Sequence, residues 1–177
     1  MARIDPLPIE QTPAETLTAY QHHVDEYQAR ITNMKATLGH SKLAFEVYMQ
    51  WYPLYDRVKA ILGQRLAYLF AYSISSGSNC PLCSTFFRKI IIDHGESVEN
   101  LTLTEQEQLI LDFGTAIAKH QGHLKGDLFD AIRQTFTLPE LVELIAFAGQ
   151  MIATNVFNNV LETDLDEYLL AYLPTPQ

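Results

Sequence analysis

A chain of 177 residues, 47% of them hydrophobic, is long enough to fill one core and too short for two typical domains, so we expect one domain over 1–177. Its 12 Lys and Arg residues against 21 Asp and Glu residues give a net charge of -9, which repels nucleic-acid phosphates on average. We therefore exclude DNA and RNA as expected partners.

The start of the chain lacks the apolar core of a signal peptide, and no apolar run approaches the roughly 20 residues of a membrane-spanning helix. We therefore expect a cytoplasmic protein with no membrane partner. Disulfides are rare in the cytosol, where they are mostly catalytic or redox-sensing. A closely spaced pair of cysteines in such a protein favours a functional role over a permanent crosslink.

Residues 1–11 contain Pro6 and Pro8 and are predicted to form an extended lead-in. A long N-terminal helix is predicted over 12–39, because apolar residues recur there at alternating spacings of three and four. These residues are Leu17, Tyr20, Val24, Tyr27, Ile31, Met34 and Leu38. The apolar side of this helix should pack along another helix, in the same subunit or in a neighbouring one.

Ser41 begins a second predicted helix, which bends or breaks near Pro53 and is rich in aromatic residues. These are Tyr48, Trp51, Tyr52 and Tyr55. Aromatic residues at helical spacing fill a core or a subunit contact more often than they line a ligand pocket, so we favour packing. A third helix over 64–74 is apolar nearly all round, which predicts a buried position.

Both cysteines lie in the stretch Cys80-Pro-Leu-Cys83, at the start of the next predicted helix. Pro81 suits the first turn of a helix, where its missing N–H costs nothing. Residues three apart share a helical face, so the two sulfurs lie close enough to form a disulfide. The positive end of the helix favours a thiolate there. A dithiol in this position suits redox exchange.

Two other roles for the cysteines remain open. A structural zinc site needs four ligands, and only His120 and His123 could complete one. Because Gly122 lies between them, we interpret these histidines as surface residues and expect no metal and no cofactor. The other alternative is a pair of inert buried thiols, since free cysteine is among the most buried residue types.

The second half of the chain is also helical in pattern. Thr104 and Thr137 each begin a capping box, and Asp127 can cap a short helix between them. The last long helix has an apolar stripe and then amides at Asn155, Asn158 and Asn159. Because no alternating strand pattern and no Gly-rich phosphate loop occur, we predict an all-α fold.

This order of parts resembles the alkyl hydroperoxidase D-like and carboxymuconolactone decarboxylase superfamily over roughly Gly39 to Leu161. The shared parts are an apolar helix, a Ser/Gly break, Cys-x-x-Cys opening a buried helix, and capped helices ending in Asn-x-x-Asn. The resemblance implies an AhpD-like helical bundle that forms a homo-oligomer, either a trimer or a hexamer. It also implies that Cys83 attacks a peroxide or a disulfide and that Cys80 resolves the product.

The sequence departs from the redox branch of that family at two positions. The branch has a Glu followed by eleven residues and the Cys-x-x-Cys, then three residues and a His, and Tyr68 and Phe87 occupy these positions here. Phe87 places apolar bulk beside Cys83, which disfavours a thiolate. Tyr68 could still relay a proton or donate a hydrogen bond to a sulfur, and His120 is the second candidate for that role.

The sequence therefore predicts a thiol-dependent peroxidase or disulfide oxidoreductase that cycles Cys80 and Cys83 between dithiol and disulfide. A thiol or dithiol protein would return the electrons, and the replaced Glu and His would slow the reaction with peroxide. The alternative is a non-redox helical oligomer that binds a small acid, a lactone or a protein partner and has structural cysteines. A fold family does not decide between these chemistries.

Overall fold

A computed structural model describes residues 1–174, and all regular structure within them is helical. The α-helices are α1 (Ala14–Tyr27), α2 (Asn33–Leu38), α3 (Lys42–Met49), α4 (Trp51–Leu62), α5 (Gln64–Gly77), α6 (Pro81–Asp93), α7 (Glu105–Lys119), α8 (Gly126–Thr135) and α9 (Leu138–Leu161). Three short 3-10 turns are η1 (Ile9–Gln11), η2 (Val98–Asn100) and η3 (Glu167–Tyr172). The predicted all-α class is confirmed.

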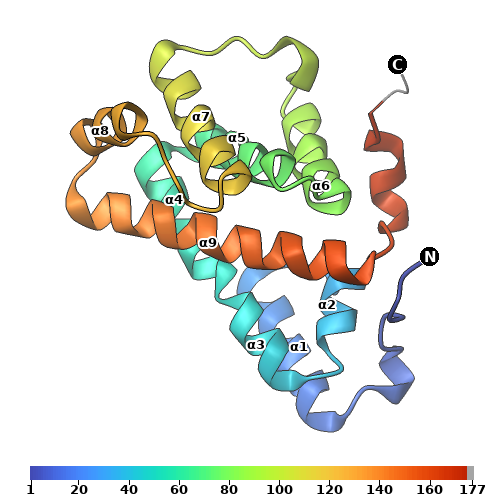
Figure 1. Ribbon diagram of the computed structural model, residues 1–177. Coiled ribbons are helices and arrows are strands. Elements are labelled where there is room, and N and C mark those ends of the chain that lie inside the picture. The colour runs from blue at the N-terminus through green and yellow to red at the C-terminus, as the bar shows by residue number, and fades with distance from the viewer. Residues whose placement is uncertain (175–177) are drawn as a thin grey trace.

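Helix α9 crosses the molecule, with α5 to α8 on one side of it and α1 to α3 on the other (Figure 1). Helix α5 lies at the centre and packs against α4, α6, α7 and α9. The N-terminal segment lies beside the end of α9, where the backbone N–H of Arg3 donates to the carbonyl of Leu161 at 2.8 Å. The turn η3 then runs back along α6.

The main core forms around α5, whose residues from Ala67 to Ser75 are buried except for the half-buried Tyr72. Phe70 of α5 is fully buried, and its ring lies between those of Phe113 and Phe147, with centroids 6.3 and 6.1 Å away. Gly114 lets α7 approach α5 closely, because a Cβ atom there would overlap Phe70 and Ser73. The buried position predicted for this helix is confirmed.

The long helix predicted over 12–39 is wrong, because this segment forms two helices, α1 and α2. Gln28 ends α1 in the left-handed conformation, with φ of 50°. Helix α2 starts at Asn33, whose backbone N–H donates to the carboxylate of Asp166 at 3.0 Å, 133 positions along the chain. A distant carboxylate therefore caps a helix start that periodicity does not reveal. The lead-in over 1–11 carries the short turn η1.

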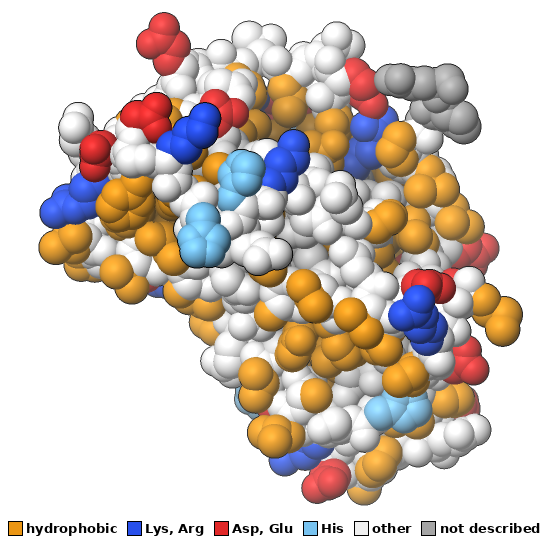
Figure 2. Space-filling model, viewed as in Figure 1, with side chains coloured by type: hydrophobic (Ala, Val, Ile, Leu, Met, Phe, Trp, Pro, Cys, Tyr) orange, Lys and Arg blue, Asp and Glu red, His pale blue; other side chains and the backbone are white. Residues whose placement is uncertain are grey.

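Helix α9 bears on the expectation that the chain has no membrane-spanning helix. It has 24 residues and is long and apolar enough to cross a membrane by length and composition, a test that buried helices of soluble proteins also pass. Glu140, Glu143 and Gln150 interrupt the apolar run, which is why counting consecutive apolar residues does not find it. Inward residues such as Leu144 join the core. Outward apolar residues are exposed, and Figure 2 shows hydrophobic side chains on the face that α9 crosses.

Candidate functional site

The two cysteines lie at the start of α6, as predicted, and they form a disulfide. Cys80 is the N-cap residue, and its Sγ accepts a hydrogen bond from the backbone N–H of Cys83 at 3.3 Å. Pro81 occupies the first helical position. The Cα atoms are 5.3 Å apart, within the range that a disulfide spans. The local geometry of the helix start therefore brings the two sulfurs together.

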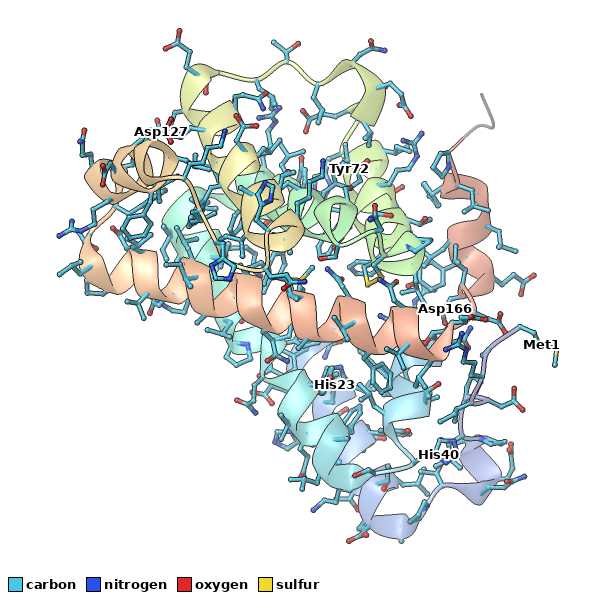
Figure 3. The ribbon with its side chains drawn as sticks, viewed as in Figure 1. Met1, His23, His40, Tyr72, Asp127 and Asp166 are labelled. Carbon is cyan, nitrogen blue, oxygen red and sulfur yellow. A yellow bond between two sulfur atoms is a disulfide. The ribbon has the colours of Figure 1, made fainter. Side chains whose placement is uncertain are left out.

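A side chain from α9 completes the surroundings of the disulfide. Asn158 is buried, and its Nδ2 donates a hydrogen bond to Sγ of Cys83 at 3.3 Å. Sequence reasoning noted the amides at the end of this helix but did not connect them to the cysteines. The signal was the spacing of Asn155 and Asn158, which places both on one helical face. Figure 3 shows the disulfide in yellow between α6 and α9.

Tyr68 makes its hydrogen bond away from the disulfide. Its hydroxyl donates to Oε1 of Glu96 at 2.8 Å, and Glu96 also accepts from Nε of Arg65 at 2.9 Å. Burial and the bond to Glu96 raise the pKa of Tyr68 to about 12. His120, the second candidate relay, is exposed at the end of α7. The side chain that donates a hydrogen bond to Cys83 is therefore Asn158. Neither Tyr68 nor His120 makes this contact.

Cys83 faces a cavity of about 110 Å³ that is bounded by α2, α3, α4, α6, α9 and η3. Cys80 does not line it. Most of the wall is apolar and includes Trp51, Leu82, Phe86, Phe87, Met151 and Leu169. Trp51 is fixed in this wall by a hydrogen bond from its Nε1 to Sδ of Met151, 2.8 Å long. A small apolar molecule in this cavity would lie next to one sulfur of the pair.

The cavity revises our interpretation of the aromatic residues around Pro53. Only Tyr55 serves packing alone, with its ring stacked on Trp51 and Phe147 at centroid distances of 4.5 and 5.7 Å. The other three aromatic residues of the group, Tyr48, Trp51 and Tyr52, line the cavity. Consecutive turns of α3 and α4 therefore contribute both to the core and to the cavity wall. The spacing of aromatic residues in the sequence does not distinguish these two roles.

Polar side chains reach the cavity wall from α2, α4, α9 and the start of η3. Lys35 is only 5% exposed, and its Nζ donates to the hydroxyl of Tyr52 at 2.7 Å and to the carbonyl of Arg30 at 2.8 Å. Loss of solvent around this ammonium lowers the pKa of Lys35 to about 8. Asp166, labelled in Figure 3, lines the same cavity, and burial raises the pKa of its carboxyl group. Lys35 is thus a buried cation in a largely apolar chamber.

Within residues 1–174 no group of three or more His, Cys, Asp or Glu side chains is placed to hold a metal ion. The chemical groups that the site offers are therefore a disulfide at a helix start, an amide donor to one sulfur, and a chamber with aromatic walls. These groups suit thiol and disulfide chemistry on a small molecule.

Solved structures share this arrangement of helices. A variant of the debrominase Bmp8 in complex with 2,3,4-tribromopyrrole matches with a TM-score of 0.77 over 96% of this chain and 94% of its own, at 17% identity. An uncharacterized peroxidase-related protein from Silicibacter sp. TM1040 matches with a TM-score of 0.70 over 95% of this chain and 93% of its own, at 13% identity. The chain has the alkyl hydroperoxidase D-like fold.

The AhpD-like fold implied by the sequence resemblance is therefore confirmed. Apo Bmp8 also matches, with a TM-score of 0.72 and 15% identity over 96% of this chain and 95% of its own. No protein-family model and no curated protein matches the chain in sequence. At these identities the neighbours establish the fold alone, and the chemistry has to be argued from the site.

Proposed function

We propose that this protein is a thiol-dependent peroxidase or disulfide oxidoreductase for small molecules, and that it cycles Cys80 and Cys83 between dithiol and disulfide. The observation that carries the proposal is a disulfide at a helix start with one sulfur, that of Cys83, on the wall of a cavity. After reduction, the helix terminus and the amide of Asn158 both favour a thiolate at Cys83. Cys83 is then the attacking thiol and Cys80 the resolving one.

The proposed cycle with a peroxide has three steps. The Cys83 thiolate attacks the O–O bond, takes one oxygen to become a sulfenic acid, and releases an alkoxide that gains a proton to form an alcohol. The Cys80 thiol attacks that sulfenic acid, which forms the disulfide and releases water. A thiol or dithiol protein then supplies two electrons and two protons by thiol–disulfide exchange. Because Cys80 is 1% exposed, we expect the reductant to attack the sulfur of Cys83.

The residues at the two relay positions favour a slow reaction of Cys83 with peroxide. Tyr68 holds Glu96, and Phe87 is an apolar residue beside Cys83, so neither position supplies the sulfur with an acid or a base. General acid–base catalysis typically contributes a factor of about 10² to 10⁴. Turnover with peroxide should therefore be well below that of a site with a Glu and His relay.

A second candidate reaction is the removal of halogen from a small aromatic ring. The aromatic cavity beside Cys83 favours it, and one neighbour of the same fold is a debrominase crystallised with a brominated pyrrole. The net change would replace a ring C–Br bond with C–H, release bromide and one proton, and oxidise the dithiol to the disulfide. Cys80 and Cys83 would supply the two electrons.

The test is a comparison of the intact protein with Cys83→Ser and Cys80→Ser, using dithiothreitol as electron donor. The intact protein should consume an organic hydroperoxide. Cys83→Ser should be inactive, and Cys80→Ser that has been reduced and then freed of dithiothreitol should stop after one turnover with a sulfenic acid that dimedone traps. Ser84→Ala, next to Cys83, is the matched control. If the intact protein and Cys83→Ser are equally inactive with a hydroperoxide, and neither releases bromide from a brominated pyrrole, the proposal is rejected.

We also propose that the protein is a homo-oligomer, through the exposed apolar side of α9. Three residues on this side, Val142, Val156 and Val160, are each more than half exposed. Contiguous exposed apolar residues are typical of subunit contacts. Light scattering coupled to size exclusion gives the mass in solution, and a mass of one 20.1 kDa chain would reject this part of the proposal.

A further inference from the structure

Lys35 is a buried cation with no carboxylate at ion-pair distance among residues 1–174, although the charge of Asp166 on the same cavity wall acts on it from farther away. Its side chain is 5% exposed, and its Nζ donates to two neutral acceptors, the hydroxyl of Tyr52 and the carbonyl of Arg30. Within residues 1–174 no carboxylate oxygen lies within 4.0 Å of Nζ, since Lys35 takes part in no ion pair there. Burying an unpaired ammonium is unfavourable, and buried lysines are normally paired. A negative group placed beside Nζ would offset this penalty.

Lys35 and Tyr52 together have hydrogen-bond donors to spare. An ammonium group has three N–H donors, and the described contacts of Lys35 use two of them. The hydroxyl of Tyr52 accepts from Lys35 and, among residues 1–174, donates to no acceptor. Burial raises the pKa of Tyr52, so this hydroxyl keeps its proton. Both residues line the cavity, and together they can donate to the oxygens of one carboxylate or phenolate.

The rest of the cavity fits a flat apolar ring. Its walls include the rings of Trp51, Phe86 and Phe87 and the thioether of Met151, all of which make favourable contacts with aromatic rings. Its volume of about 110 Å³ is similar in scale to the roughly 150 Å³ cavity that takes one benzene molecule. The space therefore suits a single ring with a small substituent, and Cys83 lies in the same wall.

Asp166 is the one wall residue that argues against an anion. Its carboxylate accepts the backbone N–H of Asn33, so one oxygen is already committed to the start of α2. Burial raises the pKa of this carboxyl group, which weakens its repulsion of a negative ligand. Asp166 therefore reduces the affinity for an anion but does not remove the attraction of Lys35.

We propose that the cavity binds one-ring aromatic anions, such as benzoates and phenolates, through Lys35 and Tyr52. The further statement that such anions are the substrate class of Cys83 rests on the function proposed above. The ligand class itself depends only on the cavity and its buried cation. A reacting molecule would carry the aromatic ring, the anionic group and the bond that Cys83 attacks.

Binding can be measured without any turnover. Trp51 is the one tryptophan of the chain and lines the cavity, so quenching of its fluorescence reports occupancy. The disulfide form is titrated with sodium benzoate and with benzamide, a neutral molecule of the same shape. Benzoate should bind roughly ten- to a hundredfold more tightly than benzamide, because hydrogen bonds to charged groups are the stronger ones.

Lys35→Met keeps the length of the side chain and removes its charge. It should weaken benzoate binding by roughly ten- to a hundredfold and leave benzamide binding unchanged, and unchanged benzamide binding also shows that the cavity is intact. Lys42→Met, on the exposed side of α3, is the control of equal charge change. Equal affinity for benzoate and benzamide, or a Lys35→Met variant that binds benzoate normally, would overturn the proposal.

The two proposals fail in different experiments. If benzoate binding depends on Lys35 but Cys83→Ser matches the intact protein in every turnover assay, the ligand class stands and the redox function falls. If the turnover assays succeed but benzoate does not quench Trp51, the ligand class falls alone. As a direct link between the two, saturating benzoate should slow alkylation of Cys83 in the reduced protein by at least tenfold.

Discussion

Asn158 and Cys83 are joined by a hydrogen bond of 3.3 Å from Nδ2 to Sγ, although 75 positions separate them in the chain. The bond connects the last turns of α9 to the first turn of α6. An N–H donor stabilises a sulfur anion more than a neutral thiol, so this contact matters most when the disulfide is reduced. Phe87 lines the same cavity as Cys83 but has no polar group, which leaves Asn158 as the side-chain donor in the described structure.

Asn158→Leu keeps the approximate shape of the side chain and removes the donor. We expect it to slow the reaction of reduced Cys83 with iodoacetamide at neutral pH by about three- to tenfold, since a hydrogen bond contributes roughly 1 kcal/mol. Mass spectrometry of the alkylated peptide, in a Cys80→Ser background, measures the rate. The control is Asn159→Ala, because Asn159 donates to the carbonyl of Ser78 and does not touch the sulfur. Equal rates for the two variants would contradict the prediction.

Tyr68→Phe separates a structural role from a proton relay. The substitution removes the hydrogen bond to Glu96 and leaves the contacts between Glu96 and Arg65 in place. We expect a loss of about 1 kcal/mol in the free energy of unfolding, measured with urea, and no change in the rate of Cys83 alkylation or of peroxide consumption. A large fall in peroxide consumption with unchanged stability would instead assign Tyr68 to the relay.

Phe147→Ala tests how the aromatic core supports the cavity. Phe147 is fully buried, and its ring contacts those of Tyr55 and Trp51 at centroid distances of 5.7 and 5.8 Å. Truncation should lower the free energy of unfolding by about 3 to 5 kcal/mol, through lost burial and the cavity that is left behind. Leu43→Ala, at an exposed position of α3 outside the proposed subunit contact, should change it by less than about 0.5 kcal/mol. Comparable losses in the two variants would show that the core is placed wrongly.

The parts of the fold that the sequence predicts are those fixed by neighbouring residues. Pro81 and the cysteines mark the start of α6, and the capping boxes at Thr104 and Thr137 both form in the structure. The two helices in place of one over 12–39 could not be predicted in this way. The start of α2 depends on Asp166, which only the folded chain brings to Asn33.

The residues of the candidate site also differ in whether neighbouring residues in the sequence predict them. Cys80 and Cys83 are recognisable because their spacing and their helix start are local features. The periodic pattern over 12–39 predicts that Lys35 lies on the polar, exposed side of one long helix. Lys35 is buried instead, because α2 is separate from α1 and packs near α4 and η3. Its partner Tyr52 is 17 positions away. A cavity wall assembled from five helices and a turn has no signature in any one segment.

His23 is a buried histidine that should make stability depend on pH. It is 3% exposed, and among residues 1–174 neither of its ring nitrogens has a hydrogen-bond partner. Its ring packs against those of Tyr52 and Phe45, with centroids 4.7 and 5.6 Å away. Burial, with a smaller contribution from the charge of Lys35, lowers the pKa of His23 to about 4 from an ordinary value of 6.5.

Between about pH 6.5 and pH 4 the unfolded chain therefore binds a proton at this position that the folded chain does not. The contribution of His23 to stability is complete above pH 6.5 and falls as the pH decreases toward 4, by up to about 3 kcal/mol at roughly 1.4 kcal/mol per pKa unit.

Urea unfolding of the intact protein and of His23→Phe at pH 7.5, 6.5, 5.5 and 4.5 isolates this contribution, because all other titrating groups are shared. The difference in unfolding free energy should shift in favour of His23→Phe as the pH falls. If His23→Phe keeps a constant difference across this range, His23 is protonated in the folded protein and its burial has been misjudged.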